Sequence, residues 1–226
     1  MIINKKTKIV ATLGPATNTK ETLTELASSG VNVFRINFSH ADYEDVKKRV
    51  KQIREINQEN GYNVAILADL QGPKLRVGVM EDGVILEDGD EFIFTTEECV
   101  GNNEKAFMTY QNFPRDVKPG EQILVDDGKL LFEVISTDKK LKVVTKVIVG
   151  GVLSSKKGVN LPNTNISLPA LTEKDKKDAI FALSLDVDWL ALSFVRTPED
   201  LRILRDLIAQ NSTYRVPVIA KIEKPE

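Results

Sequence analysis

An alternation of strand-like and helix-like segments, interrupted once by a long stretch of another kind, most constrains how this chain can fold. Residues 8–13, 31–38 and 64–70 are short apolar, β-branched runs, and the segments after the first two, 19–29 and 42–60, carry apolar residues at helical spacing. Strands that are apolar on both faces are typical of a parallel sheet covered by helices. The pattern therefore predicts an α/β fold.

The rhythm changes after Gly72-Pro73. From Lys74 to Leu168 the chain alternates in short runs separated by turn pairs such as Asp82-Gly83 and Asp127-Gly128, which predicts an all-β insertion built of hairpins. The first pattern then resumes. We expect helices from 172 to 185 and after 197, where Thr172 with Asp175 and Thr197 with Asp200 mark helix starts, and strands at 189–194 and 216–222.

These segments predict two domains. Residues 1–73 and 169–226 are expected to form the βα domain, and residues 74–168 the inserted β domain. An eight-stranded βα barrel needs about 250 residues, more than the two βα segments supply. The chain is therefore expected to form either a small open α/β sheet or little more than half of a barrel.

Composition excludes several classes of protein. Lys and Arg number 31 against 33 Asp and Glu, so the net charge of −2 gives no general attraction to nucleic acid or to an anionic membrane. Cys99 is the single cysteine and cannot form an internal disulfide. Because there is no secretory signal and no apolar run long enough to span a bilayer, we expect a cytoplasmic protein without a membrane or nucleic-acid partner.

Charged residues stand at the carboxyl ends of three expected strands. Arg35 and Asn37 share one face of the second strand, Asp69 ends the third, and Lys221 and Glu223 end the last. In βα folds the active site lies at these ends, so the pattern favours a catalytic site. The alternative is a buried ion network that performs no chemistry.

Other familiar sites are excluded or left open. His40 is the only histidine, so a histidine-based triad or multi-histidine metal site is not possible. The phosphate-loop, dinucleotide and hydrolase motifs do not occur. Lys156-Lys157-Gly158 fits a solvated turn and a polyphosphate-binding turn equally well.

Six motifs follow one another in a fixed order: Thr12–Thr17, Phe34–His40, Asp69–Arg76, Lys156–Pro162, Ala191–Arg196 and Ile219–Glu223. Together they resemble the motifs of the pyruvate kinase family. The resemblance spans the chain from about Lys5 to Glu226. It implies a (β/α)8 TIM barrel, incomplete in this chain with about five strands, into which an all-β barrel lid is inserted after the third strand.

The resemblance also implies a reaction and roles for residues. The family transfers a phosphoryl group from phosphoenolpyruvate to ADP in glycolysis, giving pyruvate and ATP. Arg35 would hold the phosphoryl group, Lys221 would stabilise that group and the enolate oxygen, and Glu223 would bind Mg²⁺ or Mn²⁺. Ser193 and Phe194 match residues that contact substrate. The positions that match the nucleotide site are Thr12, Pro15, Asn37, His40, Arg76 and Lys157.

The family's monovalent-cation site would fall at Asn37, Ser39, Asp69 and the carbonyl of Leu70. Lys74, however, stands where potassium-dependent members carry glutamate. A fixed ammonium can supply the charge that K⁺ otherwise brings, so we expect weak or absent activation by K⁺.

The sequence ends before the family's second carboxylate metal ligand, its last barrel strands and its C-terminal domain. We therefore expect a fragment that is inactive alone, whereas the complete enzyme would be a homotetramer. Two alternatives stay open: a truncated, non-catalytic module that binds nucleotide or protein, and a different barrel enzyme acting on a phosphoenolpyruvate-like or oxo-acid substrate.

Overall fold

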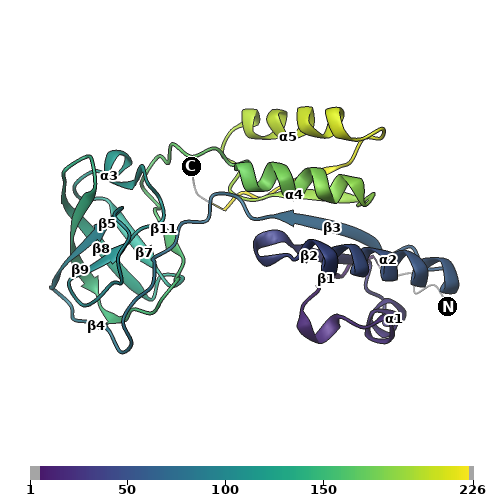
Figure 1. Cartoon of the computed structure of the whole chain (residues 1–226), viewed down its shortest axis with the longest axis horizontal. Helices are drawn as coiled ribbons and strands as arrows, with labels where there is room; N and C mark the ends of the chain where they lie inside the picture. Colours follow the sequence, from purple (N-terminus) through teal and green to yellow (C-terminus); the bar gives the residue numbers. More distant parts are fainter. Residues whose placement is uncertain (1–5, 224–226) are drawn as a thin grey trace. The chain divides into compact units, whose positions relative to one another are not determined.

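The computed structural model describes residues 6–223, and the chain divides into two compact units (Figure 1). Of the described residues, 6–73 and 169–223 form the first unit, and 74–168 form the second. The chain thus leaves the first unit after Pro73 and returns at Pro169.

The first unit is built on a five-stranded parallel sheet. Its strands lie in the order β1 (Val10–Thr12), β2 (Val33–Asn37), β3 (Ala65–Leu70), β12 (Trp189–Leu192) and β13 (Val218–Ala220). This is also their order along the chain, whereas an open doubly wound sheet reverses its strand order. The topology is that of successive βα units in a barrel, and it confirms the predicted partial barrel sheet rather than the open-sheet alternative.

Helices follow the first four of these strands. They are α1 (Lys20–Ser28), α2 (Tyr43–Asn60), α4 (Glu173–Ser184) and α5 (Pro198–Asn211), with short 3-10 turns η1 (Pro15–Thr17) and η2 (Phe38–His40). Thr172 and Thr197 each cap a helix in a reciprocal capping box with the aspartate three residues on, as predicted. None of the helices described is long and apolar enough to cross a bilayer.

Alternate residues of β2 separate the core from the site. Phe34 and Ile36 are buried against the helices in one hydrophobic cluster with Leu23, Ile53 and Leu204. Arg35 and Asn37 occupy the opposite face of the strand. The face that carries the polar residues is therefore fixed by the burial of its apolar neighbours.

The strand predicted at 189–194 ends early. β12 stops at Leu192, because Phe194 adopts a left-handed backbone conformation with φ 56°, which cannot continue a strand. The strand predicted at 216–222 is likewise confined to Val218–Ala220. Ser193, Phe194, Lys221 and Glu223 consequently lie in the segments that follow the strands.

The second unit is a β domain with an aromatic core. A six-stranded sheet has the order β11 (Val159–Asn160), β7 (Gln122–Val125), β8 (Leu130–Thr137), β9 (Lys142–Val149), β5 (Glu91–Thr95) and β6 (Lys105–Phe107), and β4 (Ile85–Leu86) pairs with β10 (Gly151–Val152). One short helix, α3 (Phe113–Asp116), is described. The rings of Phe94, Phe113 and Phe132 are fully buried.

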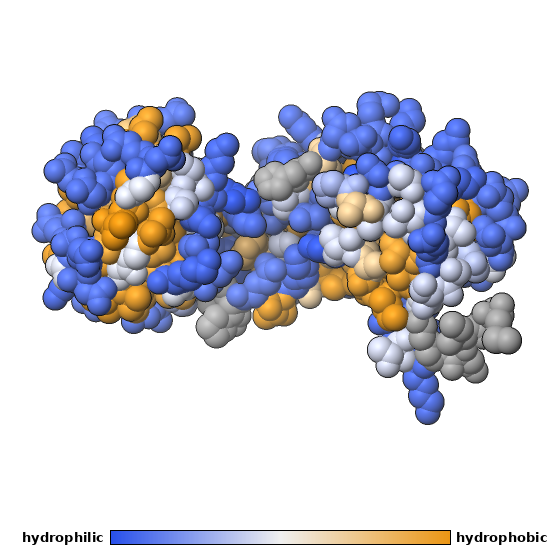
Figure 2. All heavy atoms as spheres, turned by 90° about the horizontal axis from the view of Figure 1, so that it is seen from below, coloured by the Kyte–Doolittle hydropathy of each residue, from blue (hydrophilic) through white to orange (hydrophobic). Residues whose placement is uncertain are grey.

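One pairing in this unit departs from the expected hairpins. β6 lies parallel to β5, whereas the other pairs of labelled strands described in the unit are antiparallel. The connection between them therefore crosses over rather than turning back. Figure 2 shows one face of the molecule, on which hydrophobic as well as hydrophilic side chains reach the surface of each unit.

Candidate active site

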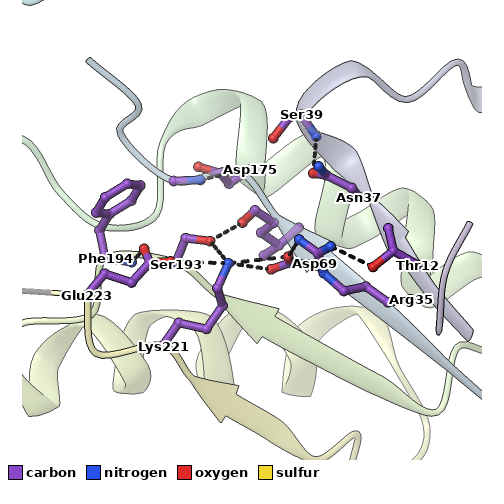
Figure 3. Close-up of polar contacts among 12 residues, drawn as sticks. Thr12, Arg35, Asn37, Ser39, Asp69, Asp175, Ser193, Phe194, Lys221 and Glu223 are labelled. Atoms are coloured by element: carbon purple, nitrogen blue, oxygen red, sulfur yellow. Dashed lines mark hydrogen bonds and ion pairs between the residues drawn. The ribbon is translucent and has the colours of Figure 1, made fainter. Parts of the chain in front are cut away.

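The carboxylate of Asp69 joins two cationic side chains at the carboxyl end of β3 (Figure 3). Its Oδ2 atom accepts a hydrogen bond of 2.7 Å from Nε of Arg35 and a second one from a terminal guanidinium nitrogen of Arg35. Its Oδ1 atom lies 3.1 Å from Nζ of Lys221. Asp69 is only 2% exposed, so one buried anion orients two cations that remain partly open to solvent.

The contacts extend from this carboxylate to the neighbouring strands. Arg35 donates to Oγ1 of Thr12 at 2.9 Å, which connects β2 with β1. Lys221 donates to Oγ of Ser193 at 2.7 Å, and Ser193 in turn donates to the carbonyl oxygen of Leu70 at 2.7 Å. The carboxyl ends of five parallel strands thus contribute to one hydrogen-bonded set, whereas the strand pattern predicts contributions from three of them.

Glu223 lies beside this set. Its Oε2 atom accepts the backbone N–H of Phe194 at 3.1 Å, and its Oε1 atom lies 3.5 Å from Nζ of Lys221 (Figure 3). The left-handed turn at Phe194 aims this N–H at the carboxylate. Within residues 6–223, no group of three or more His, Cys, Asp or Glu side chains is placed to hold a metal ion.

Gly72 allows the loop after β3 to approach this turn closely. It has φ 69°, and a Cβ atom there would lie 2.9 Å from Cδ2 of the Phe194 ring and 3.1 Å from Cβ of Ser193. The N–H of Gly72 donates to Oδ1 of Asp175 at 3.1 Å. Since Asp175 is fully buried, this contact anchors the loop just before the chain leaves for the second unit.

The expected monovalent-cation residues are engaged by protein groups. Oδ1 of Asn37 accepts the N–H of Ser39 at 3.0 Å within η2. The carboxylate of Asp69 already contacts Arg35 and Lys221, and the carbonyl of Leu70 accepts the Ser193 hydroxyl.

Other residues expected near a nucleotide occupy loops of both units. Pro15 opens η1, and His40 ends η2, but the side chain of His40 lies outside the described part of the structure. In the second unit, Arg76 donates to the carbonyl of Lys156 at 2.8 Å. Lys74 is exposed at the start of that unit.

Lys157 forms an ion pair inside the second unit. Its Nζ atom lies 3.0 Å from Oδ1 of Asp126, whose Oδ2 atom lies 2.9 Å from Nζ of Lys129. Hydrogen bonds from Lys129 and Lys157 lower the pKa of Asp126 below its ordinary value. The carboxylate therefore stays charged and holds Lys157 on its own unit near neutral pH.

Two buried carboxylates of α4 were not predicted from the sequence to be site residues. Asp175 was expected only to cap the helix, and Asp178 was not singled out, yet they are 0% and 2% exposed. Each is linked to a segment more than a hundred residues before α4. Asp175 accepts the N–H of Gly72 directly, and Asp178 is linked to the carbonyl of Phe38 through Lys174. The available signal was a pair of aspartates at helical spacing beside the apolar Ala179 and Ala182.

Comparison with known proteins agrees with this geometry. A family model described as the barrel domain of pyruvate kinase matches residues 4–226. The pyruvate kinases of Corynebacterium glutamicum and of Mycobacterium tuberculosis H37Rv are 44% and 41% identical to this chain over 225 residues, covering 99% of it and 47% of each relative. The pyruvate kinase of Geobacillus stearothermophilus is 42% identical over 226 residues, covering 99% of the chain and 38% of that protein.

The chain thus spans less than half the length of these curated relatives. The match extends over both of its units, including the β domain between the two barrel segments. The resemblance inferred from the six motifs is confirmed, and the chain belongs to the pyruvate kinase family.

Proposed function

We propose that the protein transfers the phosphoryl group of phosphoenolpyruvate to ADP, giving ATP and, after protonation of the enolate, pyruvate. The observation that carries this proposal is the convergence of Arg35 and Lys221 on Asp69 at the carboxyl ends of the parallel strands. Phosphoryl transfer depends on positioning and on electrostatic stabilisation of equatorial oxygens. Two cations fixed at one point suit that task.

The two cations would perform different parts of the reaction. The guanidinium of Arg35 is planar and permanently charged, so it suits a forked contact with phosphate oxygens. Lys221 would stabilise the transferring phosphoryl group and the oxygen of the departing enolate. Ser193, which accepts a hydrogen bond from Lys221, would help to set the direction of its ammonium, and Phe194 would bound the substrate beside it.

The nucleotide would be bound by residues of both units. In the first unit we propose Thr12, Pro15, Asn37 and His40, and in the second unit Arg76 and Lys157. The second unit would act as the lid. Its closure would exclude water, which would otherwise compete with ADP for the phosphoryl group. Lys157 would then exchange its partner Asp126 for a phosphate oxygen.

Glu223 fits one position in the coordination shell of Mg²⁺ or Mn²⁺. Its carboxylate is partly exposed, and such hard cations accept one or two carboxylates together with water and substrate phosphates. A bound divalent ion would neutralise charge on the transferring group. The described residues supply no complete shell, so Glu223 would act with phosphate oxygens and water.

The cationic side chains around Asp69 affect the expected dependence of the activity on K⁺. The carboxylate of Asp69 is paired with two protein cations, Arg35 and Lys221. Together with Lys74, this favours a site that needs little or no K⁺.

A non-catalytic module that binds nucleotide or protein is the alternative from another class. We propose to assay pyruvate formation from phosphoenolpyruvate, ADP and Mg²⁺ with this chain and with a form extended to the length of its relatives. Activity in the extended form supports the enzyme, and we expect the short form to be silent. Silence in both forms favours the binding module, whereas pyruvate formed without phosphorylation of ADP favours a different barrel enzyme. A cytoplasmic location and a homotetrameric complete enzyme stay predictions.

A further inference from the structure

The first turn of α4 contacts the turn that follows β2. Nζ of Lys174 donates a hydrogen bond of 2.7 Å to the carbonyl oxygen of Phe38, which opens η2. A three-residue 3-10 turn has few hydrogen bonds of its own. An ammonium donor to its first carbonyl is therefore an anchor, because charge-assisted hydrogen bonds are stronger than neutral ones.

The ammonium of Lys174 is itself held in place. The carboxylate of Asp178, one helical turn further on, has its Oδ2 atom 2.6 Å from Nζ of Lys174, and its Oδ1 atom accepts the hydroxyl of Tyr43 at 2.7 Å. The ring of Tyr43 stacks on Phe181 with a centroid distance of 4.0 Å and an interplanar angle of 7°. Asp178 is 2% exposed, so this carboxylate is oriented from two sides.

The hydroxyl of Tyr43 keeps its proton near neutral pH. Burial, followed by the hydrogen bond with Asp178, raises the pKa of Tyr43 to about 12. Tyr43 therefore remains a donor to Asp178. The contacts from α2 through α4 to the turn after β2 form one continuous set, Tyr43 to Asp178 to Lys174 to the Phe38 carbonyl.

We propose that Lys174 is a positioning residue for the nucleotide side of the active site. It does not reach the group of contacts around Asp69, but it fixes the turn whose N-cap is Asn37 and which contains Ser39 and the backbone of His40. The N–H of Ser39 donates to Oδ1 of Asn37 at 3.0 Å, so a displaced turn would also release the Asn37 side chain. The link to ADP rests on the proposed function, whereas the fixing of the turn does not.

Amide hydrogen exchange tests the positioning role independently of activity. In Lys174→Met the amide of Ser39 should exchange about tenfold faster, because the anchor at Phe38 is lost, while the amides of β2 keep their protection. Lys176→Met is the matched control, since Lys176 lies on the same turn of α4 and pairs only with the exposed Glu173 at 2.7 Å. Lys174→Arg, which keeps a cationic donor, should restore much of the protection.

Two further measurements complete the experiment. Tyr43→Phe keeps the stacked ring and removes one donor to Asp178, so it should increase the exchange rate of the Ser39 amide by a smaller factor. This variant replaces Lys174→Met in the experiment if Lys174→Met does not fold. In the extended form, Lys174→Met should raise KM for ADP about fivefold while kcat and KM for phosphoenolpyruvate change less. A merely structural role would lower thermal stability without this selectivity.

Each outcome decides one part of the proposal. Equal exchange at Ser39 in Lys174→Met and Lys176→Met would overturn the positioning role, even if the enzyme is a pyruvate kinase. Faster exchange with an unchanged KM for ADP would overturn the link to the nucleotide. Faster exchange together with no pyruvate formation in the extended form would support the positioning role and contradict the proposed function.

Discussion

Nε of Arg35 lies 2.7 Å from Oδ2 of Asp69, and these two residues stand on the neighbouring parallel strands β2 and β3. In the strand register Asp69 is opposite Asn37, two residues beyond Arg35, so both side chains lie on the same face of the sheet. Lys221 contacts the same carboxylate from the segment after β13. Asp69 therefore fixes the separation of two cations that would bind one phosphoryl group.

Replacing Asp69 by Asn should disable the site more than it unfolds the protein. The amide keeps the shape but leaves Arg35 and Lys221 without their shared anion, so the two cations repel each other and lose their orientation. We expect kcat/KM for phosphoenolpyruvate in the extended form to fall about 100-fold. The control is Asp188→Asn, which removes the pair with Arg54 elsewhere in the first unit. Similar losses of activity in both variants would contradict the role assigned to Asp69.

Gly72→Ala should destabilise the protein by more than its backbone conformation alone requires. Alanine at φ 69° is strained, and its Cβ would also be forced against Phe194 and Ser193. Gly61, which ends α2 at φ 67° with nothing within 4 Å, is the matched control for the strain. We expect Gly72→Ala to lower the free energy of unfolding by about 1–3 kcal/mol more than Gly61→Ala in urea titrations. Equal losses of unfolding free energy would show that the close packing of Gly72 against Phe194 and Ser193 adds nothing to the cost of the substitution.

Potassium should have little effect on the rate. Asp69 already carries two protein cations, and Lys74 stands where potassium-dependent relatives are expected to carry glutamate. Pyruvate formation by the extended form should be equal in K⁺ and in a large, inert monovalent cation. Lys74→Glu should then create a requirement for K⁺. A large loss of rate without K⁺ in the unsubstituted protein would contradict this account.

The second unit should lose stability in alkali through Tyr110. Burial, followed by a hydrogen bond to Asp116, raises the pKa of Tyr110 to about 12. Because the pKa of Tyr110 in the folded protein exceeds the ordinary value of 10, the protonated hydroxyl stabilises the fold. This contribution to the free energy of unfolding is complete below about pH 10 and is lost as the pH rises towards 12. Denaturant unfolding of wild type and Tyr110→Phe should therefore differ most below pH 10 and converge above it. A difference that does not change with pH would contradict the assignment.

The strand period of two was the most informative feature of the sequence for the site. It placed Arg35 and Asn37 on one face of β2, and burial of Phe34 and Ile36 fixes which face that is. The capping boxes at Thr172 and Thr197 were also readable, because each depends on residues three apart.

Contacts between distant segments could not be read in the same way. Asp175 and Lys174 reach Gly72 and Phe38 across more than a hundred residues, and a local pattern carries no information about such partners. The parallel pairing of β5 with β6 was missed because short alternating runs with turns between them resemble hairpins whichever way they pair. The left-handed conformation of Phe194 could not be predicted, because the position is not occupied by glycine, the residue that usually indicates a positive φ.

The proposed role of Lys221 is best tested by the rate of pyruvate formation from phosphoenolpyruvate and ADP, compared between the unsubstituted extended form and its Lys221→Met variant. Lys221→Met removes the ammonium that contacts Asp69 and Ser193, and Lys176→Met removes an exposed ammonium of the same unit. We expect kcat to fall by at least about 100-fold in Lys221→Met and to be unchanged in Lys176→Met. Full activity in Lys221→Met would contradict this role.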